Sequence, residues 1–67
     1  MSRFSIGQVV ESTVTAQGAV AGRQYKVVDI EVLSIPFGDY VSYQLEDDNG
    51  KRLWMSNGHL LLNEVGP

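Results

Sequence analysis

Few side chains in this sequence could carry out catalysis. His59 is the only histidine and there is no cysteine, so thiolate nucleophiles, disulfides and cysteine metal sites are excluded. A zinc site would have to use carboxylates beside His59, an unusual ligand set. A histidine base needs a pocket and an orienting partner, whereas His59 follows Asn57 and Gly58 in a segment typical of a turn. We therefore expect a non-enzymatic protein with no catalytic residue, no metal site and no cofactor.

The carboxylates offer an acid–base pair only if two of them meet across a cleft. Glu11, Asp29, Glu31 and Glu46 instead alternate with apolar residues along strand-like segments. Alternate side chains of a strand point to opposite faces of a sheet. This pattern favours a solvent-facing position for these four side chains.

The acidic segment 47–50 suggests a calcium loop, but its spacing does not fit one. With Gly50 placed at the loop glycine, Leu45 falls at the first ligand position and Ser56 at the last, where a bidentate glutamate is needed. We expect this segment to be the tip of a β-hairpin.

The strand pattern predicts where the aromatic side chains point. Trp54 should lie on the face opposite to the core, together with Tyr40, Gln44 and Arg52, and Phe37 should add apolar surface at a loop tip. Exposed Trp, Tyr and Arg are enriched at binding hot spots, so these five residues are the predicted partner-binding residues. The alternative is that strand bending buries Trp54 in a second, minor core under the first long loop.

Strand periodicity dominates the chain, and no window of ten residues carries a helical apolar stripe. We expect strands over residues 8–15, 25–33, 40–46, 51–56 and 61–65, with a long loop over 16–23, a turn over 34–39 and one 3₁₀ turn over 57–60. The 67 residues form one domain. The predicted core is Val10, Val28, Ile30, Val32, Val41, Tyr43, Leu45, Leu53, Met55 and Leu61.

The register of the hairpin between residues 40 and 56 can be predicted. A two-residue turn at Asn49-Gly50 would place Leu45 opposite Trp54. A three-residue loop over 48–50 places Leu45 opposite Leu53, Gln44 opposite Trp54 and acid opposite base, and it puts glycine where a left-handed residue is required. We expect the second register, because a one-residue slip would turn every side chain to the other face.

The order of strand, long loop, hairpin-linked strands, turn and final strand resembles SH3-like small barrels. The resemblance lies in Gly7-Gln8-Val9-Val10, in residues 22–27, in Leu53-Trp54 and in the ending 61–65. It implies an all-β fold, a small five-stranded SH3-like barrel with one 3₁₀ turn before the last strand. The pattern G-x-x-Y-x-V followed by a hairpin also resembles short uncharacterised proteins of phages and prophages, and implies an accessory role.

The net charge and the short apolar runs limit the kinds of partner that we expect for this protein. The net charge is −3 with the five basic residues scattered, so nucleic-acid binding is disfavoured. No apolar run is long enough for a bilayer, and the N-terminus lacks a signal-peptide core, so we expect a cytoplasmic protein. The leading hypothesis is a protein–protein binding module. The alternatives are a nucleic-acid-binding small barrel and a homo-oligomer with a site at its symmetry axis.

Overall fold

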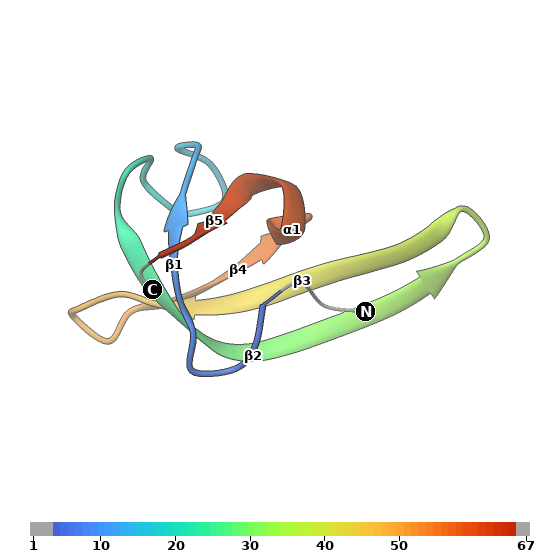
Figure 1. The fold of residues 1–67 in the computed structure, drawn as a ribbon, viewed down its shortest axis with the longest axis horizontal. Coiled ribbons are helices and arrows are strands. Elements are labelled where there is room, and N and C mark those ends of the chain that lie inside the picture. Colours follow the sequence, from blue (N-terminus) through green and yellow to red (C-terminus); the bar gives the residue numbers. More distant parts are fainter. Residues whose placement is uncertain (1–3, 66–67) are drawn as a thin grey trace.

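The computed structural model describes residues 4–65 and consists mainly of one antiparallel sheet (Figure 1). Its elements are β1 (Val9–Ser12), β2 (Gln24–Ile35), β3 (Gly38–Glu46), β4 (Arg52–Ser56), α1 (Gly58–Leu61) and β5 (Leu62–Glu64). The prediction of an all-β fold with five strands is confirmed. The first strand is shorter than expected, whereas β2 and β3 are longer.

The sheet is not closed into a barrel. Its strand order is β4-β3-β2-β1-β5, so β4 and β5 are its two edges and do not pair with each other. The expectation of a closed barrel is therefore wrong. The α1 turn joins the two edge strands directly, and the main chain and hydroxyl of Thr13 both donate hydrogen bonds to the Leu61 carbonyl, at 2.9 and 2.7 Å. These bonds extend the β1–β5 pairing by one residue beyond Ser12 and Leu62, so the short α1 connection, and not a shared ladder, links the two edges.

The β3–β4 hairpin has the predicted register. Leu45 lies opposite Leu53, and Gln44 lies opposite Trp54. The Asp47 N–H donates to the Lys51 carbonyl at 3.0 Å, which closes a three-residue loop. Gly50 has a φ of 80°, a left-handed conformation that glycine adopts without steric cost. The side-chain pattern and the loop chemistry thus select the same pairing.

A β-bulge in β2 changes which of its residues face the core. Val27 pairs with Leu45, but the next pair is Asp29 with Gln44, so Val28 is an extra residue in the ladder. Val27 is fully buried and Val28 only half-buried. The predicted core position of Val28 is wrong because the sequence pattern carries no signal for this insertion.

The core lies on the inner face of the sheet. Its members are Phe4, Val10, Ala19, Tyr25, Val27, Val41, Tyr43, Leu45, Met55 and Leu62, with Ile30, Leu53 and Leu61 packed at its margin. The Phe4 ring meets Tyr43 edge-on, with ring centroids 5.3 Å apart. Tyr25 is buried as well, and its hydroxyl accepts a hydrogen bond from the Val20 N–H at 3.0 Å. Phe4, Ala19, Tyr25, Val27 and Leu62 were absent from the predicted core.

The long loop between β1 and β2 covers the edge strand β4. The Gln17 side chain accepts a hydrogen bond from the Ser56 N–H at 2.8 Å and donates one to the Ser56 carbonyl at 3.3 Å. A Cβ built on Gly18 would lie 3.6 Å from the Leu53 Cβ, which shows how closely the loop approaches β4. One amide side chain therefore satisfies the outward main-chain groups of Ser56 as a neighbouring strand would.

The turn before β5 is α-helical rather than 3₁₀. Its first bond joins the Leu60 N–H to the Asn57 carbonyl, with 3₁₀ spacing, at 2.9 Å. The Leu62 N–H then donates to the Gly58 carbonyl, four residues back. This second bond has the spacing of an α-helix. Gly58, at the start of the turn, packs directly on the Tyr43 ring.

The hairpin of β2 and β3 extends beyond the core as an arm, defined here as residues 32–40 (Figure 1). Only Pro36 and Phe37 form its turn, because Ile35 pairs with Gly38. The pairing of β1 with β2 ends at Lys26, so β1 does not reach the arm. Val32 lies on the core-facing side of the sheet but is 48% exposed. Its predicted core position is wrong because the arm extends beyond the core.

A methyl group at Gly58 should destabilise the fold. A Cβ there would collide with the Tyr43 ring and lie 3.1 Å from Leu62 Cδ1. We expect Gly58→Ala to lower the free energy of unfolding by about 1–3 kcal/mol, the usual cost of overpacking. Urea denaturation measures this value. Leu60→Ala in the same turn is the control, because Leu60 is 72% exposed; equal stability of the two variants would contradict the packing described.

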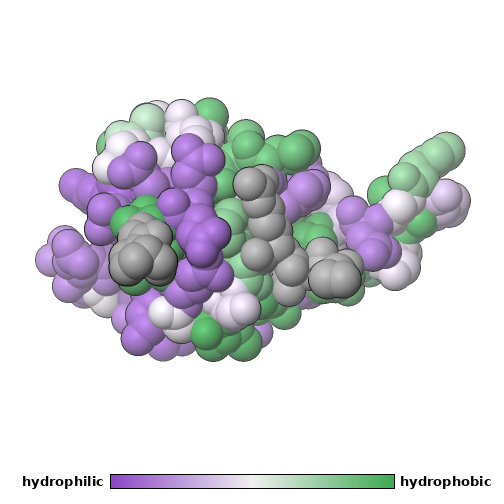
Figure 2. All heavy atoms as spheres, in the orientation of Figure 1, coloured by the Kyte–Doolittle hydropathy of each residue, from purple (hydrophilic) through white to green (hydrophobic). Residues whose placement is uncertain are grey.

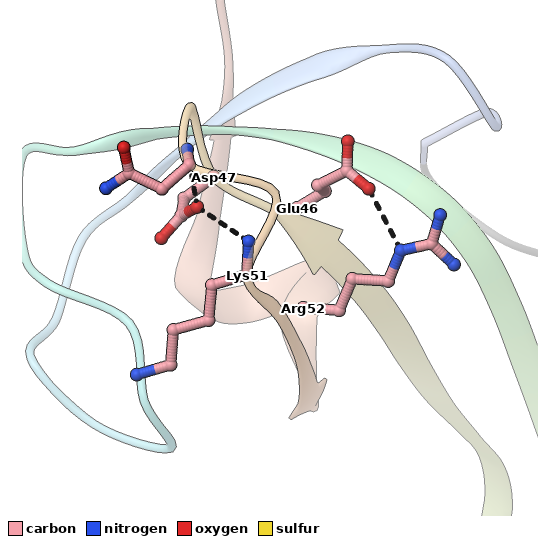
Figure 3. A network of polar contacts seen from close by, with 5 residues as sticks. Glu46, Asp47, Lys51 and Arg52 are labelled. Atoms are coloured by element: carbon pink, nitrogen blue, oxygen red, sulfur yellow. Dashed lines mark hydrogen bonds and ion pairs between the residues drawn. The ribbon is translucent and has the colours of Figure 1, made fainter.

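Asp47 should stabilise the β3–β4 loop more than Asp48 does. Asp47 Oδ1 accepts hydrogen bonds from the Asn49 and Lys51 N–H groups, both at 2.9 Å (Figure 3). We expect Asp47→Ala to cost about 1 kcal/mol of unfolding free energy. Asp48→Ala should stay within about 0.5 kcal/mol of the parent chain. A thermal melt that ranks the two variants in the opposite order would refute this account of the loop.

Candidate functional site

The outer face of β2, β3 and β4 is formed by the side chains that alternate with the core. Val41, Tyr43 and Leu45 of β3 point inward and are buried. Tyr40 and Ser42 therefore point to the opposite face. The cross-strand pairs carry this alternation into the neighbouring strands, and the outer-face residues are Lys26, Asp29, Glu31, Leu33, Tyr40, Ser42, Gln44, Glu46, Arg52, Trp54 and Ser56.

A hollow of about 270 Å³ lies on this outer face. It is lined by Glu31, Leu33, Tyr40, Ser42 and Trp54. Ser42 is opposite Glu31 on β2, and Leu33 is opposite Tyr40. Trp54 is opposite Gln44, one outward position along β3 from Ser42. The hollow, called here the Ser42 hollow, thus forms where a small side chain lies among large ones.

The walls of the Ser42 hollow are mostly apolar, with one carboxylate. Trp54 is 41% exposed, so its indole is a wall open to solvent and is not part of the buried core. Glu31 is exposed and is, among residues 4–65, the only charged residue that lines the hollow. Two aromatic rings and a carboxylate make a surface that favours apolar groups and cations.

An ion pair lies at the far end of the same face, beside the hairpin loop. Arg52 Nε donates to Glu46 Oε2 at 2.9 Å, as Figure 3 shows. Both side chains are partly exposed, so the pair contributes little to stability. It fixes the position of Arg52, which does not line the Ser42 hollow.

The structure groups three of the five predicted binding residues. Trp54 and Tyr40 line the Ser42 hollow, and Gln44 lies directly across from Trp54. Arg52 shares the face but is held by Glu46. Phe37 is 97% exposed at the tip of the arm, away from the hollow. Apolar side chains reach the end of this arm (Figure 2).

Sequence reasoning missed the other residues that line the Ser42 hollow, namely Glu31, Leu33 and Ser42. The signal that could have found them is the turn at Pro36-Phe37. A two-residue turn there pairs residues whose numbers add up to 73, which places Glu31 opposite Ser42 and Leu33 opposite Tyr40, as observed. The expected break over residues 34–39 was too long to give this register.

Two further hollows lie near the β3–β4 loop. One, of about 340 Å³, is lined by Val9, Gln24, Tyr25, Lys26, Glu46, Asp47 and Asp48; the other, of about 210 Å³, is lined by Arg23, Asp47, Asp48 and Asn49. Asp47 is already engaged by the main chain of its own loop. Among residues 4–65 no group of three or more His, Cys, Asp or Glu side chains could hold a metal ion. These hollows are therefore weaker candidates.

Removal of the Trp54 side chain should leave the fold intact. The indole is partly exposed on the outer face, whereas its neighbour Met55 is fully buried. We expect Trp54→Ala to change the unfolding free energy by less than about 1 kcal/mol and Met55→Ala to lower it by about 2–5 kcal/mol. Denaturant titrations of both variants test this. Unfolding of Trp54→Ala would show instead that the indole supports a core.

Comparison with known proteins gives no family for this chain. No family model, no curated protein and no solved structure matches it. In the part of the chain that the structure describes, no helix has the length and apolar character needed to cross a membrane.

Proposed function

We propose that the protein is a small non-enzymatic binding module that docks another protein on the outer face of β2, β3 and β4. The observation that carries this proposal is the Ser42 hollow, which presents Trp54 and Tyr40 to solvent in one concave patch. Trp and Tyr side chains held in a pocket are the residue types that dominate binding energy at protein interfaces.

The strands that present these aromatic side chains are held by packing on their other face. Tyr43 and Met55 pair across β3 and β4 and are fully buried. They immediately follow Ser42 and Trp54 in the chain, so the core fixes the backbone beneath that part of the hollow, and Tyr40 lies at the base of the arm, next to the buried Val41. A surface fixed in this way loses little conformational entropy when a partner binds.

The chemistry of this face favours a protein over a nucleic acid. Asp29 and Glu31 share the face with Trp54, and within the described part of the chain no basic side chain lines the hollow. Their carboxylates would repel the phosphate backbone of a nucleic acid. The SH3-like and phage resemblance, and a cytoplasmic location for an accessory protein, stay predictions from the sequence.

The test is affinity capture with the full chain and matched variants. Immobilised wild-type protein should retain a partner from an extract of the source cell treated with nuclease. We expect at least tenfold less of that partner on Trp54→Ala and Tyr40→Ala, because hot-spot truncations cost about 2 kcal/mol or more. Quantitative mass spectrometry of the eluates measures the change.

Leu60→Ala is the matched control for this capture. Leu60 is 72% exposed, but its helical turn packs through Gly58 on the inward-facing Tyr43, so it lies away from the outer face. This variant should retain the partner fully. A partner retained equally by Trp54→Ala and Leu60→Ala would rule out the outer face as the docking site, and a signal lost on nuclease treatment would favour the nucleic-acid alternative.

A further inference from the structure

The charge balance of the outer face leaves one carboxylate available at the Ser42 hollow. Within residues 4–65 the single ion pair is Arg52 with Glu46. Glu31 takes no part in that pair and its side chain is exposed at the rim of the hollow. Among the described residues, the charge that lines the hollow is therefore negative and open to an incoming group.

The aromatic walls also favour a positively charged ligand. The faces of indole and phenol rings carry negative potential and attract cations within about 6 Å of the ring centre. Trp54 and Tyr40 line the hollow together with Glu31. A cation placed there would meet attraction from both rings and from the carboxylate.

The size of the hollow limits the ligand to one side chain. Its volume of about 270 Å³ lies below the roughly 300–1,000 Å³ of pockets that enclose a cofactor or drug-sized molecule. Leu33 supplies an aliphatic wall on the β2 side, where the methylene groups of a long basic side chain can pack.

Of the two basic side chains, arginine fits these walls better. Its planar guanidinium stacks on aromatic faces, donates two parallel hydrogen bonds to a carboxylate and is less strongly hydrated than an ammonium group. We propose that the Ser42 hollow takes an arginine side chain of the partner protein, its guanidinium against Trp54 and Tyr40 and paired with Glu31. This assignment rests on the binding function proposed above.

The experiment compares two short peptides whose side chains have nearly the same shape, one with a charged guanidinium and one with a neutral ureido group. The ¹⁵N-labelled full chain is titrated with acetyl-Gly-Ser-Arg-Ser-Gly-amide and with the same peptide carrying citrulline, the neutral isostere of arginine. We expect the arginine peptide to shift the Trp54 indole N–H and Ser42 amide signals with a millimolar dissociation constant. The citrulline peptide should bind roughly three- to thirtyfold more weakly, and the difference should shrink at high salt.

Matched variants separate the carboxylate from the shape of the hollow. Glu31→Gln should reduce the preference for arginine over citrulline and leave the fold unchanged, because the side chain is exposed. Ser42→Val fills the floor of the hollow and should abolish binding of both peptides. Ser56→Val makes the same change on the residue that pairs with Ser42 but does not line the hollow, and it should bind the arginine peptide as the parent chain does.

The outcomes distinguish this inference from the proposed function. Equal binding of the arginine and citrulline peptides would overturn the arginine assignment, as would tighter binding of a third peptide that carries lysine in place of arginine, titrated in the same way. Absence of any shift at the Trp54 indole with the arginine peptide would overturn it too. In each case, loss of the captured partner on Trp54→Ala would still uphold protein docking on the outer face.

Discussion

The packing of the Tyr43 ring is the constraint on which the rest of the structure depends. Tyr43 lies in the central part of the sheet, opposite Ile30 on β2 and Met55 on β4. Phe4 meets it edge-on, and Gly58 approaches it so closely that no side chain fits there. A slip of one residue in β3 would exchange this ring with Ser42 and lose all of these contacts. The aromatic ring thus fixes the register of three strands at once.

The Ser42 hollow is a direct consequence of this register. Because Tyr43 points inward, Ser42 and Gln44 must point outward, and the paired strands bring Glu31 and Trp54 to the same face. On these strands the inward-facing side chains stabilise the fold, and the outward-facing side chains determine what the outer face can bind. A substitution that keeps the inner pattern can therefore change what the outer face binds while the fold stays the same.

The parts of the fold that depend on local alternation could be predicted from the sequence, and those that depend on distant contacts could not. The β3–β4 register followed from matching Leu45 with Leu53 and from the glycine at position 50. The bulge at Val28 left no local signal, because valine suits either face. Phe4 and Ala19 lie in segments outside the strands, and their burial depends on contacts with residues that are distant in the sequence. For the candidate site, Trp54 and Tyr40 followed from alternation, whereas Glu31 required the register of the second hairpin.

The open sheet bears on how this molecule can recognise a partner. An open edge offers main-chain groups to any extended segment, which is a route to aggregation. At the β4 edge the Gln17 amide already occupies the main-chain groups of Ser56, and the strand begins with the charged Arg52. The β5 edge carries the exposed polar side chains of Asn63 and Glu64. Strand addition is thus opposed at both edges, while the outer face leaves Trp54 and Tyr40 accessible. Recognition through side chains on that face is the mode that this arrangement favours.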